Sequence, residues 1–136
     1  MELFLAFISE QWMLVSALAV LAYVYAWTEK QKGGVTVSHH QLTRLVNDDS
    51  AVIVDLRDAS EFKAGHIVNA LNIPHAKLGD RSGELASHQE KTIILVDKMG
   101  HHAGTAGRVL KAKGFEVNRL EGGMTDWQSN NLPVVV

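Results

Sequence analysis

The pattern of hydrophobic and polar residues divides the chain into two unlike parts. Residues 11–28 carry no charged side chain, whereas acidic and basic residues are spread throughout the sequence from Glu29 onward. A helix over this run, at about 1.5 Å per residue, comes close to the thickness of a bilayer core. Trp12 and Trp27 lie near its ends, where aromatic side chains anchor helices among headgroups. The pattern predicts a transmembrane anchor over residues 1–28 that contacts the lipid bilayer through residues 11–28.

Two other interpretations of this apolar run are disfavoured. A cleavable signal peptide begins with a basic region, but the residues before the run include Glu2 and Glu10 and no lysine or arginine. A core helix of a soluble domain would carry a polar stripe, and this run is apolar on every face.

The residues after the run predict its orientation and the start of a second part. Lys30 and Lys32 follow directly, and the positive-inside rule then places the C-terminal part in the cytoplasm. Residues 29–34 are mostly polar and end in two glycines, which predicts a short flexible tether. We therefore expect a single-pass membrane protein with a globular domain over residues 35–136.

Within this domain, strand patterns alternate with helical patterns. Apolar and β-branched runs predict five strands, at residues 35–37, 51–55, 70–73, 92–96 and 116–120. Between and after them the sequence predicts a helix capped by Ser38, a helical turn around residues 60–63, a helix from about Thr105 to Lys113, and a terminal helix after Gly123. This order is typical of a three-layer α/β/α domain with a mostly parallel sheet.

Composition excludes several classes of function. A chain of 136 residues is long enough for the anchor and one globular domain. A formal net charge of −2 at pH 7 gives no basic field, so we expect no nucleic-acid partner. The chain contains no cysteine, which excludes a catalytic thiol.

The loop after the central strand is the candidate site. A strand, a tight loop and a helix N-terminus direct several backbone N–H groups toward one spot, where they form a cradle for an anion. Parallel sheets also place their functional crevices at the carboxyl ends of the strands. The loop consists of Asp97, Lys98, Met99, Gly100, His101, His102 and Ala103.

Histidines raise the question of a metal site. His101–His102 and His39–His40 are adjacent pairs, and His75 stands alone. Adjacent histidines point in different directions on most backbones, and the spacing that supports chelation is missing. We expect solvated histidines, no metal and no cofactor.

Two segments resemble the signatures of a known family. Residues 54–67, VDLRDASEFKAGHI, together with ALNIP at 70–74, resemble the opening signature of rhodanese-like domains, and LEGGMTDW at 120–127 resembles the closing one. With the anchor, the chain is similar to the single-domain type found in bacterial inner membranes. The resemblance implies a five-stranded rhodanese fold and an inner-membrane location. It also places Asp97 where active members carry the cysteine that forms a persulfide, in a loop of the length typical of sulfurtransferases.

The signature residues have predicted structural roles. Asp55, Arg57 and Glu61 are expected to form a buried charged network, which must be fully paired to be tolerated. His66 is expected to bond backbone rather than to transfer protons. Glu121 lies in a turn that leads into the terminal helix, and Trp127 is expected to pack against the sheet. None of these residues is predicted to be catalytic.

The chemical role of Asp97 distinguishes two candidate functions. Its carboxylate can accept the hydrogen bonds of the loop and repel an incoming anion, which predicts a catalytically inactive module that binds membrane or cytoplasmic proteins. The alternative is a sulfurtransferase-related or phosphoryl-handling enzyme that uses Asp97, with Lys98, His101 and His102 around it, on an anionic substrate. A phosphoacceptor aspartate needs a second acidic group for magnesium, and the segment from Asp55 to Asp58 has the wrong spacing for that role.

Overall fold

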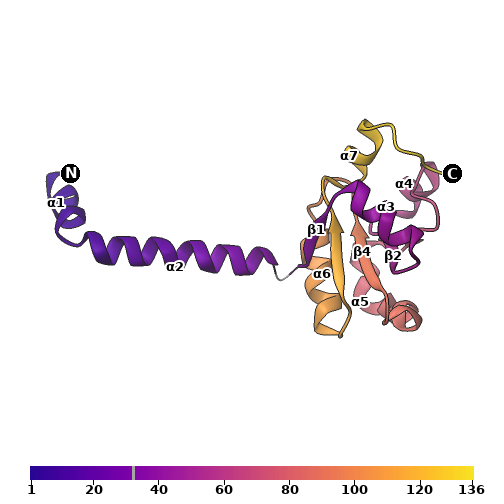
Figure 1. Ribbon diagram of the computed structural model, residues 1–136, viewed down its shortest axis with the longest axis horizontal. Coiled ribbons are helices and arrows are strands. Elements are labelled where there is room, and N and C mark those ends of the chain that lie inside the picture. The colour runs from indigo at the N-terminus through magenta and orange to yellow at the C-terminus, as the bar shows by residue number, and fades with distance from the viewer. Residues whose placement is uncertain (32) are drawn as a thin grey trace. The chain divides into compact units, whose positions relative to one another are not determined.

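The computed structural model describes residues 1–31 and 33–136, which form two compact units, Met1–Gln31 and Lys32–Val136 (Figure 1). Lys32, one of the two lysines used to predict the orientation, lies outside the described residues. The first unit contains helices α1 (Glu2–Glu10) and α2 (Trp12–Gln31). By length and composition the stretch Trp12–Glu29 of α2 could cross a membrane, with a mean hydropathy of 1.3. This stretch matches the apolar run of the predicted anchor, and the helix continues past it to Gln31.

The second unit is built on the predicted five-stranded sheet. Its strands are β1 (Val35–Val37), β2 (Ala51–Asp55), β3 (Leu71–Asn72), β4 (Thr92–Val96) and β5 (Val117–Leu120), in the order β1-β5-β4-β2-β3. All neighbouring strands are parallel. The predicted fold is therefore confirmed, and the carboxyl end of the central strand β4 lies at the edge where sites are found in such sheets.

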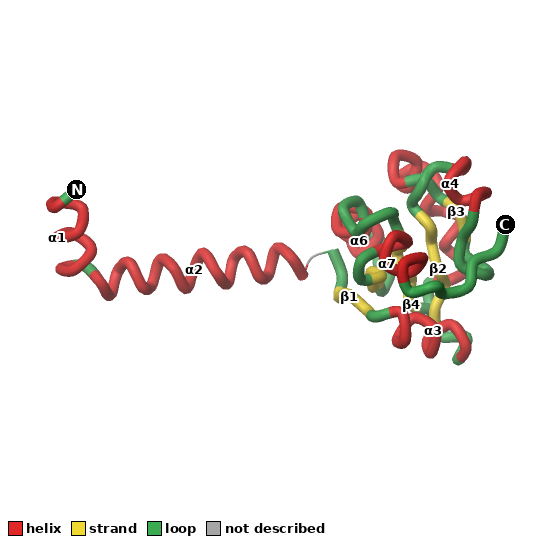
Figure 2. The backbone as a smooth tube through the Cα atoms, turned by 90° about the horizontal axis from the view of Figure 1, so that it is seen from above, coloured by secondary structure: helices red, strands yellow, loops and turns green. Residues whose placement is uncertain are grey.

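Helices cover both faces of the sheet. Side chains alternate along β4, so that Ile93 and Leu95 belong to one core cluster and Ile94 and Val96 to the other. The first cluster lies beneath α6 (Ala103–Ala112), and the second beneath α3 (His39–Asn47) and α7 (Gly123–Ser129). Figure 2 shows α6 and α3 on opposite sides of the strands.

Several short elements depart from the predicted pattern. The predicted strand at 70–73 is reduced to Leu71–Asn72, and the turn around 60–63 is part of α4 (Ala59–Ala64). The segment between β3 and β4, for which no element was predicted, forms η1 (His75–Lys77), α5 (Leu78–Arg81) and η2 (Ser82–His88). Leu78 and Leu85 of this segment are buried in the cluster beneath α6. These elements are one or two turns long, so they show too little periodicity to be read from sequence.

The glycine pair before β1 has a role different from the predicted one. Gly33 and Gly34 are both buried within the second unit. A Cβ atom on Gly33 would lie 2.6 Å from the carbonyl oxygen of Gly104, and one on Gly34 would lie 2.5 Å from that of Val117. Arg119 Nε also donates a hydrogen bond of 3.0 Å to the carbonyl oxygen of Gly34. The glycines therefore serve close backbone packing rather than flexibility.

Candidate functional site

Asp97 occupies the cradle formed by its own loop. It follows the last residue of β4 and is only 3% exposed. Its carboxylate accepts hydrogen bonds from the backbone N–H groups of Gly100, of His102 at 2.7 Å and of Ala103 at 3.2 Å. Bonds from N–H groups to an ionised oxygen are stronger than neutral ones. The N–H groups expected to bind an anion thus bind the chain's own carboxylate.

This internal carboxylate also explains where α6 begins. The helix was predicted to start near Thr105, but it starts at Ala103, and its N-cap residue is His102. The first N–H groups of a helix have no partner within the helix. Here Asp97 accepts two of them, those of His102 and Ala103, and so caps the helix from outside it.

The start of α7 holds the backbone of the loop. The N–H groups of Met124 and Thr125 donate to the carbonyl oxygens of Asp97 and Lys98, at 2.8 and 2.9 Å. Gly123 has a φ of 60°, and a Cβ atom there would lie 2.8 Å from the carbonyl oxygen of Lys98. Only glycine fits this close approach in a left-handed conformation. The preceding Glu121 is exposed and donates its backbone N–H to Val37 at 2.9 Å.

The outer rim of the loop is basic and exposed. Lys98, Met99, His101 and His102 are all exposed to solvent. The ring of His102 stacks on that of His75 from η1, with centroids 3.9 Å apart and planes 7° from parallel. Among the described residues no group of three or more potential ligands is arranged to hold a metal ion.

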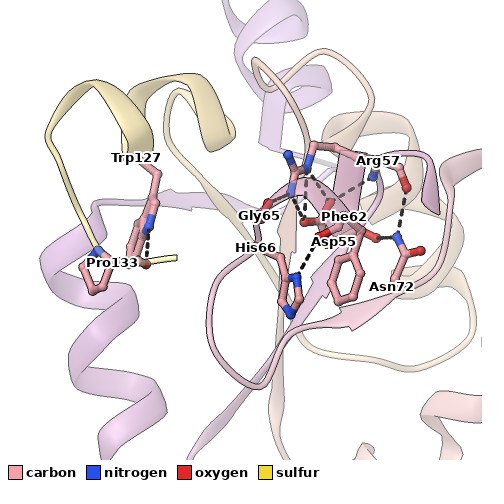
Figure 3. A network of polar contacts seen from close by, with 8 residues as sticks. All are labelled: Asp55, Arg57, Phe62, Gly65, His66, Asn72, Trp127 and Pro133. Carbon is pink, nitrogen blue, oxygen red and sulfur yellow. Dashed lines mark hydrogen bonds and ion pairs between the residues drawn. The ribbon is translucent and has the colours of Figure 1, made fainter. Parts of the chain in front are cut away.

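Asp55 and Arg57 form a buried ion pair at the carboxyl end of β2, the strand that pairs with β4 (Figure 3). Arg57 Nη2 lies 2.8 Å from Asp55 Oδ2, and Nε lies 3.0 Å from Oδ1. The backbone N–H of Arg57 donates to the same carboxylate at 3.0 Å. The Nη2 atom also donates to the carbonyl oxygen of Gly65 at 2.7 Å, which ties the end of β2 to the end of α4.

The third member of this network is Asn72, and the prediction of Glu61 was wrong. Asn72 Nδ2 donates to the carbonyl oxygens of Arg57 at 2.9 Å and Asp55 at 3.2 Å. Among the described residues Glu61 has no hydrogen bond or ion pair with Asp55 or Arg57. Nε and Nη2 of the guanidinium instead bond the carboxylate of Asp55 and the Gly65 carbonyl. Asn72 lies on β3, and its pairing depends on strand register, which sequence inspection did not reveal.

His66 and Trp127 secure the C-terminal segment. His66 Nδ1 donates to the carbonyl oxygen of Phe62 at 2.7 Å, and its ring stacks on the Phe62 ring with centroids 3.7 Å apart. Its backbone N–H and C=O groups both bond Val135, at 2.9 and 2.8 Å. Trp127 is 4% exposed within the cluster beneath α3 and α7, and its Nε1 donates to Pro133 O at 3.0 Å. Both side chains thus have backbone partners, Phe62 for His66 and Pro133 for Trp127 (Figure 3).

The chemistry open to this loop is limited by Asp97. Sulfur transfer through a protein persulfide needs a thiolate, and the chain has no cysteine. Nucleophilic attack by the carboxylate would require an exposed oxygen, and Asp97 is buried with both oxygens accepting N–H bonds. The part of the loop that other molecules can contact is its exposed rim.

Comparison with known proteins identifies the fold and its relatives. The rhodanese-like domain family matches residues 38–130. The chain is 32% identical over 130 residues to the uncharacterized protein YibN of Escherichia coli K12, covering 94% of this chain and 89% of that one. It is 30% identical over 96 residues to the thiosulfate sulfurtransferase GlpE of Shewanella oneidensis, covering 70% of this chain and 93% of that one.

Solved structures agree with this assignment. The rhodanese-like domain of an Anabaena protein is similar, with a TM-score of 0.64 at 26% identity, over 75% of this chain and 79% of that one. A rhodanese-related protein from Thermoplasma volcanium has the same fold, with a TM-score of 0.68 at 24% identity, over 75% of this chain and 98% of that one. These structures show the fold, and the family match over residues 38–130 together with the 32% identity to YibN shows that the chain belongs to the rhodanese-like domain family.

Proposed function

We propose that this protein is a membrane-tethered rhodanese-like module without sulfurtransferase activity, which serves as a docking or regulatory domain for other proteins at the inner membrane. The observation that carries the proposal is the position of Asp97, whose carboxylate accepts three backbone N–H groups of the loop. The loop has the shape of an anion-binding cradle, and the carboxylate of Asp97 occupies that cradle.

Electrostatics argues against binding of an anionic sulfur donor. An anion about 4 Å from the Asp97 carboxylate would meet a repulsion of about 4 kcal/mol at an effective dielectric of about 20. The N–H groups that could offset this cost are already bonded to Asp97. Even a bound donor would find no thiol to accept its sulfane sulfur.

The tether supports a role at the membrane. The apolar stretch Trp12–Glu29 is the candidate span, and Lys30 and Lys32 after it favour a cytoplasmic domain by the positive-inside rule. A module held at the bilayer meets membrane proteins and their cytoplasmic partners at high local concentration. The exposed rim of the loop is a surface on which such partners can dock.

An activity assay tests the absence of catalysis. We expect the full chain, purified in detergent, to form no thiocyanate from thiosulfate and cyanide above a heat-treated control. Asp97→Cys restores a thiol in the same cradle, where backbone N–H groups lower the pKa of a thiol. Its thiolate should attack the sulfane sulfur of thiosulfate, form a persulfide and release sulfite. Mass spectrometry should then find one added sulfur atom on Asp97→Cys and none on the matched variant Asp97→Ser.

The results separate the two candidate functions. Thiocyanate production by the wild-type chain would overturn the proposal. Phosphate added to the wild type by acetyl phosphate, but not to Asp97→Asn, would establish the enzyme that uses Asp97. If Asp97→Cys folds and gains no sulfur, the loop does not form a cradle that can bind thiosulfate. The proposal of a docking module would then be supported only by the membrane anchor and the exposed surface.

Crosslinking tests the docking role. A photoreactive amino acid at position 98, on the rim, should capture specific proteins in native membranes, to be identified by mass spectrometry. The same amino acid at position 111, on the exposed side of α6, is the control. Identical captures at both positions would show that the rim does not select a partner.

A further inference from the structure

The first helix of the anchor has a polar side and an apolar side. When its residues are placed at about 100° each around the axis, Glu2, Ser9 and Glu10 fall on one side, with Ala6 between them. The rest of the circumference is apolar and consists of Leu3, Phe4, Leu5, Phe7 and Ile8. Helix α2, by contrast, is apolar on every side over the candidate span. The pattern of α1 is typical of a helix at the boundary between water and an apolar phase.

The apolar side of α1 is uncovered in the first unit. Among the described residues of α1 none is buried, and Leu3, Phe4 and Phe7 are 88%, 64% and 60% exposed. Large apolar side chains gathered on one exposed face mark a contact with a membrane or with another protein. Only Gln11 separates this face from the candidate span, which begins at Trp12. A bilayer that contains α2 therefore comes within one residue of α1.

Gln11 turns the chain between the two helices. Its φ of −111° and ψ of 28° end α1, and Figures 1 and 2 show α1 turned away from the axis of α2. The N–H of Gln11 donates to the carbonyl oxygen of Phe7, and its own carbonyl accepts from Val15, both at 3.0 Å. The last carbonyl groups of α1 and the first N–H groups of α2 have no partner within their helices. Such groups are costly in hydrocarbon, so the bend belongs at the level of headgroups and water.

The residues beside the bend agree with this depth. Trp12 follows it and is 63% exposed, and tryptophan is enriched at the headgroup level of a bilayer. The 18 residues Trp12–Glu29 extend about 27 Å as a helix, close to the thickness of a hydrocarbon core, so α1 is not needed to complete the crossing. A straight continuation of α2 into α1 would also bring the carboxylate of Glu10 toward the hydrocarbon, which is costly.

We propose that α1 is an interfacial helix that lies in the membrane surface at the N-terminal end of the span, with the lipid bilayer as its partner. Leu3, Phe4 and Phe7 reach into the boundary between headgroups and acyl chains, roughly 5–10 Å deep, while Glu2 and Glu10 face water. Because α1 contains no lysine or arginine, the contact depends on apolar burial and not on anionic headgroups. The proposal rests on α2 as the span, which the proposed function also uses, and not on the absence of catalysis.

Spin labels on the full chain test this placement. The chain has no cysteine, so single substitutions can be labelled one at a time with a nitroxide in phosphatidylcholine vesicles. The variants are Phe4→Cys and Phe7→Cys on the apolar side, and Ala6→Cys and Ser9→Cys on the polar side. Oxygen concentrates in lipid and a nickel chelate stays in water, so collisions with each report the surroundings of the label. We expect the ratio of oxygen to nickel collisions to be several-fold higher on the apolar side, in vesicles with or without phosphatidylglycerol.

Two further positions calibrate the scale and separate the possible failures. Leu18→Cys lies within α2 and should give the ratio of lipid, and Lys111→Cys on the exposed side of α6 should give that of water. A water-like ratio at Leu18→Cys would overturn the span and this proposal with it. With Leu18→Cys in lipid, the proposal alone is overturned if all four α1 positions are equally lipid-like or equally water-like. Weak collisions with both reagents on the apolar side would also overturn it, because a protein or a second copy of the chain would then cover that side.

Substitutions on the two sides of α1 test the origin of the contact. With the label at Ile8→Cys, the pair Phe4→Gln and Phe7→Gln removes both aromatic rings and should shift the ratio toward that of water. Ala6→Gln introduces the same amide on the polar side and should leave the ratio unchanged. Equal responses of the two proteins would show that the apolar side does not hold α1 in the membrane surface, and the proposal would be wrong.

Discussion

The carbonyl group of Gly33 lies directly against Gly107 of α6, so closely that a Cβ atom at Gly107 would overlap it. Gly104, one turn earlier on the same helix, meets Gly33 as well. The chain therefore enters the second unit through a contact between glycine backbones.

Gly107→Ala should destabilise the domain. Alanine favours helix by up to about 1 kcal/mol relative to glycine, but overpacking of a tight contact costs about 1–3 kcal/mol or more. We expect a net decrease in the free energy of unfolding, measured by urea denaturation of residues 33–136. Gly79→Ala in α5 is the control, because a Cβ atom there has nothing within 4 Å. An equal response of the two variants would show that the Gly33 contact does not contribute.

Arg57→Ala should be among the most destabilising single substitutions in the domain. It leaves the carboxylate of Asp55 buried without its cation and removes the bond to the Gly65 carbonyl. Breaking a buried ion pair in this way costs about 3–5 kcal/mol. Arg81→Ala removes a solvent-exposed pair with Glu84 and should change the urea midpoint little. A small effect at Arg57 would mean that water replaces the guanidinium.

Asp97→Ala should open the cradle that the wild type keeps filled. The N–H groups of Gly100, His102 and Ala103 lose their partner, and we expect the free energy of unfolding to fall by roughly 2–5 kcal/mol. Sulfate should then raise the melting temperature of Asp97→Ala more than that of the wild type, because an anion can bind the freed groups. Equal stabilisation of both proteins by sulfate would contradict the internal-anion interpretation.

Reporter fusions test the predicted orientation of the anchor. Alkaline phosphatase fused after Val136 should be inactive, and green fluorescent protein fused at the same position should fluoresce, if the domain is cytoplasmic. Replacing Lys30 and Lys32 with Glu weakens the positive-inside signal and should increase phosphatase activity. Active phosphatase with the wild-type anchor would place the domain on the other side of the membrane.

The sequence predicted the sheet well because its central strands are continuous apolar runs, such as Thr92–Val96, bounded by polar residues. The hydrogen bonds of Asp97 could be predicted from local geometry. In a strand, short loop and helix N-terminus, the backbone N–H groups of the loop and of the first helical turn have few other partners. The bonds of Asn72, the packing of Gly33 and the backbone bonds between His66 and Val135 could not be predicted in this way. Each depends on a partner far along the chain, which only the folded register brings near.

The carboxylate of Asp97 behaves as a covalently attached ligand with a very high effective concentration. Dissolved anions such as thiosulfate, sulfite and phosphate compete with it poorly, so occupancy of the cradle stays constant when their concentrations change. A rhodanese-like loop that carried sulfur would differ in charge and shape between its loaded and empty states. Because Asp97 is part of the chain, the N–H groups of Gly100, His102 and Ala103 keep their partner whatever the supply of sulfur.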